Sequence, residues 1–372
     1  MKLILSILIL CPYFLSAQSP EVIKIYNKGI EAALLKDHKE AIKYYNEALL
    51  MDPLYPKAYY NRANSKMGLG DYTAAIKDFS KCLKLEPENA KANYYKAYCL
   101  MQSDQKKEAL KYFSAAIKYD PSLSRAYYYR AYIQMKDNNF DHAIRDFNEA
   151  INKDPENEKA YYNLGICYLK KDDREKALSQ FKKALAQNPK YTPALMETAK
   201  QSYKLGQFEE AVKYSMNLTA LEKQNNLAHY YLAMSYMKTG KLDEAAHTFD
   251  YLISIDPDNE TAMVNKAVIS IKQKDYNQAV NDYGKLIAFD NDNPRYYLNR
   301  ALSLMQIEEW DTSLNDLTKV IKLDPEHSEA YYNRANVYFQ LKENDKSCSD
   351  IRQSAKLGYE PAFNYVASLC QN

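Results

Sequence analysis

Apolar residues recur at spacings of three and four in short stretches along the whole chain, a pattern that predicts amphipathic helices. Turn signals such as GLGD (68–71) and KTGK (238–241) separate neighbouring helical stretches. Proline then ends the second helix of seven pairs, because it cannot continue a helix and disfavours helix in the residue before it. These prolines recur at one fixed interval or a multiple of it: Pro53, Pro87, Pro121, Pro155, Pro189, Pro257 and Pro325. The pattern predicts helix pairs, each helix having about 14 residues and a length of about 21 Å.

The whole chain repeats itself at the interval that the prolines define. The stretch AYYNRAN occurs at 58–64 and again at 330–336, which are eight such intervals apart. Counted from Val22, ten repeats fit without insertion or deletion, and each residue can be given a repeat position from 1 to 34. The expected repeats are 22–55, 56–89, 90–123, 124–157, 158–191, 192–225, 226–259, 260–293, 294–327 and 328–361.

Three repeat positions indicate close helix packing. Position 8 is Gly or Ala in every repeat, and position 20 is Ala in eight repeats and Ser in the other two. Small residues allow paired helices to approach closely, and a bulky residue at position 8 should cost about 1–3 kcal/mol by overpacking. An aromatic ring fills the adjacent space at position 24 in seven repeats: Tyr45, Phe79, Phe113, Phe147, Phe181, Phe249 and Tyr283.

Because these matches recur in ten consecutive repeats, the chain resembles the tetratricopeptide repeat (TPR) family over 22–361. The resemblance implies an all-α fold, a right-handed solenoid of antiparallel helix pairs. It also implies that the first helix of each pair lines a concave inner face. Residues 362–372 are expected to form a C-terminal capping helix. Repeats 6 to 8 (192–293) match the pattern least well, which indicates a bend or a looser seam between two better-formed halves.

Positions 7 and 23 carry a recurring pair of opposite charges. Five repeats have Arg or Lys at position 7 together with Asp at position 23. The two positions lie equally far on either side of the turn within a helix pair, so we expect ion pairs that brace each pair. A catalytic or ligand-binding role is the alternative. The expected pairs are Arg62–Asp78, Arg130–Asp146, Lys266–Asp282, Arg300–Asp316 and Arg334–Asp350.

Asparagine recurs at position 6, although it does not favour a helix interior. Its amide offers a donor and an acceptor, which match the donor and acceptor of a peptide backbone. The resemblance supports this interpretation, since TPR superhelices such as that of the enzyme that attaches N-acetylglucosamine to proteins hold extended peptides with an asparagine ladder. The alternative is that this position carries Asn without using it. The residues are Asn27, Asn61, Asn163, Asn265, Asn299 and Asn333.

Neighbouring positions of the expected inner face suit peptide recognition. Tyrosine combines a large ring, a small conformational cost and a hydroxyl group for hydrogen bonding. Basic residues at position 2 of repeats 2 to 5 favour a ligand with acidic character, although solvated lysines are the commoner explanation. We expect this face to include Tyr60, Asn64, Tyr94, Tyr98, Tyr128, Tyr132, Tyr162, Lys57, Lys91, Arg125 and Lys159.

Composition gives no sign of catalysis. Lys plus Arg (50) nearly balances Asp plus Glu (48), so no electrostatic reason exists to expect a nucleic-acid partner. The five histidines lack metal-ligand spacing, and the sequence has no glycine-rich phosphate loop or nucleophile elbow. We therefore expect no enzyme activity, no cofactor, no metal site and no small-molecule substrate.

Residues 1–17 read as a secretory signal peptide. Lys2 precedes the apolar run Leu3–Leu10, and small residues Ser16 and Ala17 suggest cleavage after Ala17, leaving 18–21 as a lead-in to the first repeat. A lipid anchor on Cys11 is disfavoured because Leu10 stands where a lipoprotein signal has Gly, Ala or Ser; an uncleaved anchor is the other alternative. No later segment is apolar for long enough to cross a membrane, so export to a periplasm or the exterior is expected.

An exported chain can form disulfides, and Cys348 and Cys370 face a shared turn at similar distances. They are a possible pair, whereas Cys82, Cys99 and Cys167 occupy packing positions and are expected to be buried thiols. Taken together, the sequence suggests an interaction scaffold that holds an extended peptide segment of another protein in its groove, in a bacterial cell envelope. The alternative is an architectural subunit that assembles through its outer face or terminal repeats.

Overall fold

The computed structural model describes residues 19–370, apart from the side chains of 366–369. The expected signal peptide and Cys11 lie outside these residues. Every regular element in the described part is an α-helix, and the helices are paired in tandem, so the all-α prediction is confirmed. None of these helices combines the length and the apolar character that crossing a bilayer requires. The chain divides into two compact units, an N-terminal unit ending at Pro189 and a C-terminal unit beginning at Lys190.

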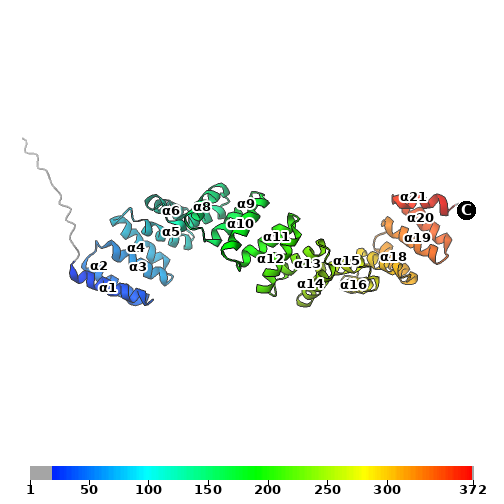
Figure 1. Ribbon diagram of the computed structural model, residues 1–372, viewed down its shortest axis with the longest axis horizontal. Helices are drawn as coiled ribbons and strands as arrows, with labels where there is room; N and C mark the ends of the chain where they lie inside the picture. Colours follow the sequence, from blue (N-terminus) through cyan, green and yellow to red (C-terminus); the bar gives the residue numbers. More distant parts are fainter. Residues whose placement is uncertain (1–18, 371–372) are drawn as a thin grey trace, which may run out of the picture. The chain divides into compact units, whose positions relative to one another are not determined.

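The N-terminal unit contains the first five helix pairs (Figure 1). Its helices are α1 (Pro20–Leu34), α2 (His38–Met51), α3 (Pro56–Gly68), α4 (Tyr72–Leu85), α5 (Ala90–Gln102), α6 (Lys106–Tyr119), α7 (Ser124–Lys136), α8 (Phe140–Lys153), α9 (Glu158–Lys170) and α10 (Arg174–Gln187).

The C-terminal unit contains five more pairs and one further helix. Its helices are α11 (Thr192–Lys204), α12 (Phe208–Leu221), α13 (Asn226–Lys238), α14 (Leu242–Ile255), α15 (Glu260–Lys272), α16 (Tyr276–Phe289), α17 (Pro294–Gln306), α18 (Trp310–Leu323), α19 (Ser328–Gln340), α20 (Asn344–Lys356) and α21 (Glu360–Leu369).

The helices keep the repeat register of the sequence. The first helices of repeats 2 to 10 begin one repeat length apart from Pro56 to Ser328, and the second helices do so from His38 to Asn344. Only the ends depart from the expected bounds, since α1 begins at Pro20 rather than Val22 and α21 begins at Glu360 rather than at residue 362. The boundary of the two units at Pro189 and Lys190 lies at the start of the irregular stretch 192–293.

The same backbone conformation recurs at the turn inside every helix pair. Position 15 has a positive φ in all ten repeats, but it is glycine only at Gly70, Gly206 and Gly240. The other repeats place a Lys, Asp, Asn or Glu in this left-handed conformation, as at Lys36, where φ is 63°. An aspartate directly after this residue often caps the second helix, as Asp71 does by accepting a hydrogen bond from the Ala74 backbone N–H at 2.9 Å.

The core consists of the small and aromatic positions. Position 24 rings such as Phe79 and Phe147 are fully buried, as are the alanines at positions 8 and 20 in their repeats. Two repeats need glycine at position 8: a Cβ at Gly29 would lie 2.6 Å from Tyr45 Cε1, and one at Gly165 would lie 2.5 Å from Phe181 Cε1. In these two repeats, the position 24 ring lies so close to position 8 that no room is left for the methyl group of an alanine.

Successive first helices lie closer to one another than successive second helices do. Contacts join α1 to α3, α3 to α5 and α7 to α9 in the N-terminal unit, and α11 to α13 and α17 to α19 in the C-terminal unit. Successive second helices in the described part of the chain do not approach to the same degree. Within each unit, the first helices therefore line the inner side of the stack.

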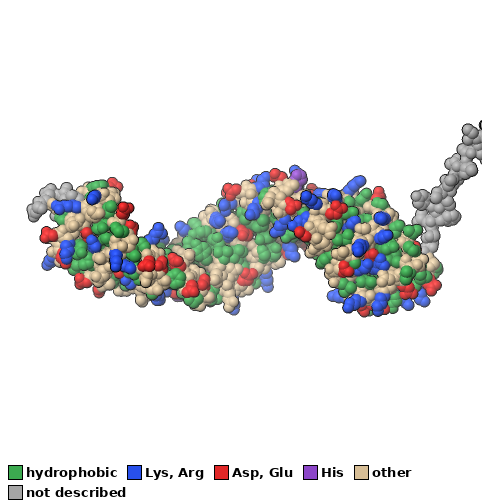
Figure 2. Space-filling view, turned by 180° about the vertical axis from the view of Figure 1, so that it is seen from behind, with side chains coloured by type: hydrophobic (Ala, Val, Ile, Leu, Met, Phe, Trp, Pro, Cys, Tyr) green, Lys and Arg blue, Asp and Glu red, His purple; other side chains and the backbone are tan. Residues whose placement is uncertain are grey.

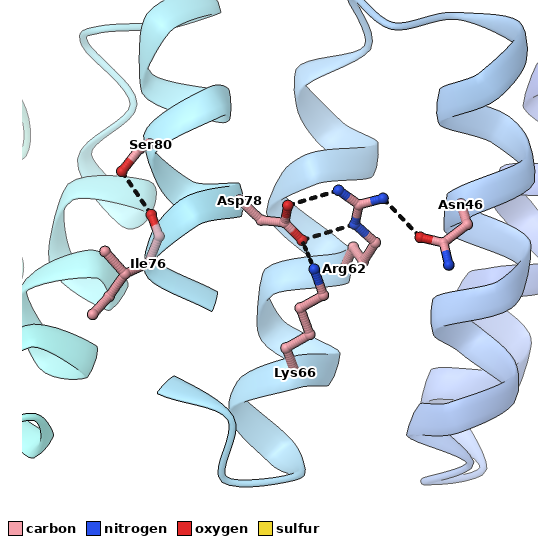
Figure 3. Close-up of polar contacts among 6 residues, drawn as sticks. All are labelled: Asn46, Arg62, Lys66, Ile76, Asp78 and Ser80. Atoms are coloured by element: carbon pink, nitrogen blue, oxygen red, sulfur yellow. Dashed lines mark hydrogen bonds and ion pairs between the residues drawn. The ribbon is translucent and has the colours of Figure 1, made fainter. Parts of the chain in front are cut away.

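Four of the five expected Arg/Lys–Asp pairs are close and nearly buried. In repeat 2, Arg62 Nε and Nη2 donate to the two carboxylate oxygens of Asp78 at 2.7 and 2.6 Å, and Lys66 Nζ lies 2.7 Å from the same carboxylate (Figure 3). Asp78 is 4% exposed, so these donors replace the water it would otherwise bind. The same two-bond geometry joins Arg130 to Asp146, Arg300 to Asp316, and Arg334 to Asp350.

The fifth pair differs from the prediction. Lys266 Nζ lies 3.9 Å from Asp282, and it makes a much shorter contact with Asp250 in the preceding repeat. A lysine presents one point charge, so it cannot bond both carboxylates as the arginine fork bonds one. Asp282 instead accepts hydrogen bonds from Ser270 Oγ and Gln278 Nε2 at 3.0 and 2.8 Å.

The bracing also extends between repeats, beyond the predicted pairs. Arg62 Nη1 donates to Asn46 Oδ1 at 2.7 Å, and Arg130 Nη1 donates to Ser114 Oγ at 3.0 Å. Both acceptors stand at position 25 of the preceding repeat, as Asp250 does. These two arginines therefore link the second helix of their own repeat to the second helix of the previous one.

A disulfide joins Cys348 of α20 to Cys370, directly after α21. It fastens the last helix to the last repeat, with a Cα–Cα distance of 5.5 Å. Cys82, Cys99 and Cys167 are buried free thiols, and burial raises the pKa of each to about 12. These three thiols are therefore poor nucleophiles at neutral pH.

Candidate functional site

The position 6 asparagines all stand on first helices, but they are not equivalent. In the N-terminal unit, Asn61 Nδ2 donates to the Tyr26 hydroxyl at 2.6 Å, and Asn163 Nδ2 donates to the Tyr128 hydroxyl at 3.0 Å. Both acceptors are position 5 tyrosines of the preceding repeat. Asn163 is only 8% exposed. These two amides join neighbouring repeats; Asn163 has little surface left for a ligand, Asn61 is half-buried, and Asn27, in the first repeat, is exposed.

Burial controls the ionisation of the tyrosine in the first of these bonds. It raises the pKa of Tyr26 to about 12, the Tyr55 ring adds to the rise, and the hydrogen bond from Asn61 opposes it. The Tyr26 and Tyr55 rings lie 4.9 Å apart between their centroids. The Tyr26–Asn61 bond is therefore part of the packed structure of the first two repeats.

In the C-terminal unit, the asparagines bond within their own helix. Asn265 Nδ2 donates to the Thr261 carbonyl at 2.8 Å, and Asn299 Nδ2 donates to the Arg295 carbonyl at 2.9 Å. This bond uses one amide hydrogen and fixes the orientation of the side chain. The second hydrogen and Oδ1 make no bond within the part of the chain that the structure describes, so they can bond a ligand.

Asn333 makes the same kind of bond, to the Glu329 carbonyl at 3.0 Å, but it is 8% exposed. Two of the six asparagines, Asn163 and Asn333, are thus largely packed into the protein. The ladder that the sequence suggested is not uniform. Its accessible members in the C-terminal unit are Asn265 and Asn299, both half-buried.

A pocket of about 310 Å³ lies between α15 and α17, and both accessible asparagines line it. The remaining lining residues are Glu260, Thr261, Val264, Tyr283, Asn293, Arg295 and Tyr296. Val264 stands at position 5, where a tyrosine of the N-terminal unit would reach the next asparagine. Because valine has no hydroxyl, the Asn299 amide stays available and the space beside it stays open.

The pocket has two charged side chains, Glu260 of α15 and Arg295 of α17. Glu260 accepts a short hydrogen bond from the Tyr296 hydroxyl, and burial together with this carboxylate raises the pKa of Tyr296. Arg295 is exposed. The pocket thus presents amide donors and acceptors, an exposed cation and a carboxylate already engaged by a neighbour.

The predicted inner-face tyrosines are used mainly for packing. Tyr60 lies edge-on to the buried Phe79 ring at 5.9 Å, and Tyr128 does the same to Phe147 at 5.8 Å. Tyr162 packs against Phe181, while Tyr94 is buried at 8% exposure. None of the four is exposed, because the position 5 ring rests on the position 24 ring of its own repeat.

Three further predicted residues are half-buried. Tyr98 lies edge-on to Tyr129, with centroids 5.3 Å apart, and Tyr132 lies under the Lys136 ammonium. Asn64 lies beside Tyr60, where burial raises the tyrosine pKa to about 12 and the Asn64 amide opposes the rise. They contribute edges of rings and one amide to the surface of repeats 2 to 4.

The basic residues at position 2 of repeats 2 to 5 are on the surface. Lys57, Lys91, Arg125 and Lys159 are all exposed, and none has an ion-pair partner within the described residues. Elsewhere the charges are mixed: Figure 2 shows Lys and Arg side chains scattered among Asp and Glu. Residues 19–370 contain no group of three His, Cys, Asp or Glu side chains that could hold a metal ion.

Family models match most of the chain. Models described as tetratricopeptide repeat match 25–53, 60–124, 100–144, 227–259 and 298–351, and one described as TPR repeat matches 267–308. The model of the cilia and flagella-associated protein 70 middle TPR-like domain matches 134–230. No curated protein matches the chain.

Solved structures similar to this chain include the C-terminal part of a TPR repeat-containing protein from Cytophaga hutchinsonii. It is 21% identical, covers 64% of this chain and 97% of its own, and has a TM-score of 0.55, which supports the fold. YrrB, described as a TPR protein with an unusual peptide-binding site, is 28% identical over 47% of this chain and 90% of its own, with a TM-score of 0.43. MamA from Desulfovibrio magneticus RS-1 is 27% identical over 47% and 99%, with a TM-score of 0.45.

The helix pairs keep one register from the first repeat to the last, and their small and aromatic positions pack as the sequence pattern requires. The family models fall on the same repeats. The chain belongs to the tetratricopeptide repeat family.

Proposed function

We propose that the protein is a non-enzymatic interaction scaffold that holds an extended peptide segment of another protein on the inner side of its first helices. The observation that carries this proposal is the pocket between α15 and α17, where Asn265 and Asn299 stand one repeat apart. Each offers a donor and an acceptor, the pair that a peptide backbone requires.

The geometry favours backbone recognition in an extended conformation. Peptide groups in a helix are satisfied internally, so a ligand that uses both asparagines must expose its own N–H and C=O groups. The bonds from Asn265 to Thr261 and from Asn299 to Arg295 hold the amides in place before binding, which lowers the entropic cost of capture. The exposed guanidinium of Arg295 favours an acidic side chain in the peptide.

In this proposal, the N-terminal unit contributes mainly positive charge to peptide binding. Its asparagines Asn61 and Asn163 are engaged by tyrosines, but Lys57, Lys91, Arg125 and Lys159 remain exposed. A partner with acidic stretches would gain from this ridge through salt-sensitive attraction. High salt should then weaken binding to the N-terminal unit more than to the pocket.

Export belongs to the same proposal. The disulfide between Cys348 and Cys370 is of a kind that persists in oxidising compartments and is rare in the cytosol. Together with the expected signal peptide, it supports a location in a cell envelope or outside the cell. Fractionation of cells that produce the full chain, followed by N-terminal sequencing of the mature protein, would test this location.

Peptide selection tests the binding proposal. A displayed library of random peptides is selected on residues 18–372, and the enriched peptides are titrated by fluorescence anisotropy. Asn265→Ala with Asn299→Ala should weaken binding by about tenfold or more, since two hydrogen-bonding amides are lost. The matched control is Asn148→Ala, because Asn148 makes the same intrahelical bond, to the Ile144 carbonyl, on the exposed side of α8. Equal affinities of the double variant and the control would contradict the proposal.

A specific observation also favours assembly through the first repeat. Leu34, Leu35, Leu50 and Leu54 are between 70% and 83% exposed, and covering them in an interface would remove this apolar surface from water. Sedimentation velocity should then show self-association that Leu50→Glu with Leu54→Glu abolishes. A monomer at all concentrations would exclude this second function for the first repeat.

A further inference from the structure

Repeat 7 lacks the Arg–Asp ion pair that braces repeats 2, 4, 9 and 10. Where repeat 2 has Arg62 and Asp78, repeat 7 has Leu232 and Thr248, and position 25 of the preceding repeat is Met216. The three replacements remove both charges and shorten two of the side chains. An open groove of about 560 Å³ occupies the place of the ion pair, with α12 and α14 as walls and α13 as floor.

The walls have a regular helical pattern. Met216, Ala220 and Lys223 line the groove from α12 and the turn after it, and Glu244, Thr248 and Tyr251 line it from α14. Glu244, Thr248 and Tyr251 have the spacing i, i+4, i+7 and share one face of α14; Met216 and Ala220 share one face of α12, and Lys223 extends that wall from the turn after the helix. Each wall therefore runs for about 10 Å, the length of two helical turns.

The floor and part of each wall are apolar, and the walls are partly exposed. Leu232 forms the floor at 7% exposure, and Met216 and Tyr251 are 49% and 39% exposed. Tyr236 closes one end, where its hydroxyl lies 3.4 Å from Met216 Sδ. Exposed apolar surface of this kind, lying in a groove rather than scattered, is typical of interaction sites.

The two ends of the groove carry opposite charges. At one end, the Lys223 carbonyl accepts hydrogen bonds from the Tyr251 hydroxyl at 3.1 Å and from the His229 Nε2–H at 2.8 Å. Lys223 Nζ has no ion-pair partner in the described part of the chain. At the other end, Glu244 lies near the Tyr236 hydroxyl, and together with burial it raises the pKa of that tyrosine. Glu244 also makes no ion pair within the described residues.

We propose that this repeat 7 groove binds an amphipathic helix of a partner protein. The helix would place apolar side chains at i, i+3 or i+4, and i+7 over Leu232, with an acidic residue at the Lys223 end and a basic residue at the Glu244 end. Parallel walls two turns long, with apolar Met216 on one and the Tyr251 ring on the other, fit a helix whose apolar stripe has the same period. The site goes beyond the proposed peptide pocket, because it uses another side of the helix pairs and a folded ligand.

The test uses a fluorescein-labelled peptide long enough for about four helical turns, with leucines at the stated spacing, Glu at one end and Lys at the other. Its anisotropy is titrated with the whole chain at low salt. Leu232→Arg with Thr248→Asp rebuilds the ion pair of the other repeats inside the groove and should weaken binding about tenfold or more. The matched control, Leu164→Arg with Gln180→Asp, makes the same change in repeat 5 and should leave the affinity unchanged.

A second variant tests whether a loss of binding could result from misfolding. Met216 is half exposed, so Met216→Glu should retain the helical circular dichroism and the melting temperature while weakening the peptide about tenfold. Peptides with two acidic or two basic ends should bind about threefold more weakly than the mixed one. Asn265→Ala with Asn299→Ala should not affect this peptide, so failure here is distinguishable from failure of the inner-face proposal.

Several results would overturn the inference. They are no binding of the mixed peptide to the unmodified chain, equal binding by the Leu232→Arg/Thr248→Asp variant and its repeat 5 control, and unchanged affinity in Met216→Glu. A dimer in sedimentation velocity that dissociates in Met216→Glu would also overturn it, since the occupant of the groove would then be a second copy of this chain.

Discussion

The inner faces of the two units carry the same residue at the same repeat position, yet they use it differently. In the N-terminal unit, Asn61 and Asn163 each hold a tyrosine hydroxyl of the preceding repeat. In the C-terminal unit, Asn265 and Asn299 bond only their own helix and open onto a pocket. The residue 35 places earlier decides between the two for Asn299, where Val264 stands in place of a tyrosine.

The outer positions show the same contrast. Repeat 2 fills the space between successive second helices with Asn46, Arg62 and Asp78, and repeat 7 leaves it open above Leu232. In both comparisons, a polar contact between repeats fills the space in the N-terminal example, and an apolar residue leaves it open in the C-terminal example; other C-terminal repeats keep the outer contact, as Arg334 does with Thr318. Repeat proteins can thus change what a surface binds without changing the fold that presents it.

The largest expected effect comes from breaking a buried ion pair. Asp78→Ala leaves Arg62 and Lys66 without their carboxylate and should lower the free energy of unfolding by about 3–5 kcal/mol. Thr248→Ala, at the equivalent position of repeat 7, should cost less than about 1 kcal/mol, because no charge depends on it. Hydrogen exchange of α3 and α4, compared with α13 and α14, measures both changes locally. Equal losses of stability in the two variants would contradict the difference between repeats 2 and 7 at these positions.

The double variant Arg62→Met with Asp78→Leu is the control for that measurement. It removes both members of the pair and leaves only the Lys66 ammonium, whose side chain is 20% exposed, without its partner, so it should recover much of the stability that Asp78→Ala loses.

Reduction of the disulfide should affect only the C-terminal unit. Opening the 22-residue link between Cys348 and Cys370 should lower the stability of the last repeat by about 3 kcal/mol on the chain-entropy estimate. Proteolysis with and without reductant, read by mass spectrometry, should show new cleavage in α20 and α21 and none in α1 to α10. Cleavage in the N-terminal unit on reduction would contradict this separation.

A smaller effect separates the two kinds of asparagine. Tyr26→Phe removes the acceptor of Asn61 and should lower the free energy of unfolding by about 1 kcal/mol. Tyr230→Phe makes the same change 35 residues before Asn265, which bonds Thr261 instead, and should be nearly neutral. Thermal melts of both variants test the difference, and equal losses would show that the tyrosine ring environment matters more than the amide bond.

The smallest expected effect is on the response to alkali. The pKa of Tyr26 in the folded protein is raised to about 12, above its ordinary value of 10.0, so its contribution to stability is fully present below pH 10. That contribution is lost as the pH rises from 10 towards 12, because the unfolded chain releases this proton more readily. Circular dichroism from pH 9 to 12 should show that the unmodified chain loses stability over this range more steeply than Tyr26→Phe, which has no proton to release at this position.

Much of the fold follows from the sequence because the repeat supplies its own alignment. The constant register and the buried rings at position 24 depend on residue types that recur at fixed positions. The partners of Arg130 and Arg300 could be read in the same way, since both lie within one helix pair.

The candidate site was harder to predict because its contacts run between repeats. Lys266 turns to Asp250 at position 25 of the previous repeat, and Asn61 and Asn163 bond the tyrosine at position 5 of the previous repeat, whereas Asn265 does not bond Tyr230 there. Comparing one position across all ten repeats does not show how the contacting residue in the previous repeat differs from one repeat to the next. A comparison of each residue with the one 35 places earlier would have separated Asn61 from Asn299. The turn residues were missed for a different reason, since Lys36 and Glu308 carry no signal for a positive φ.

The unbroken register has a consequence for how such a chain can change in length. Since every pair meets its neighbours through the same repeat positions, removing or duplicating one whole pair leaves complementary surfaces at the new junction. A genetic gain or loss of that size alters the span of the protein in discrete steps and keeps it foldable, whereas a shift of a few residues would misalign the junction it touches.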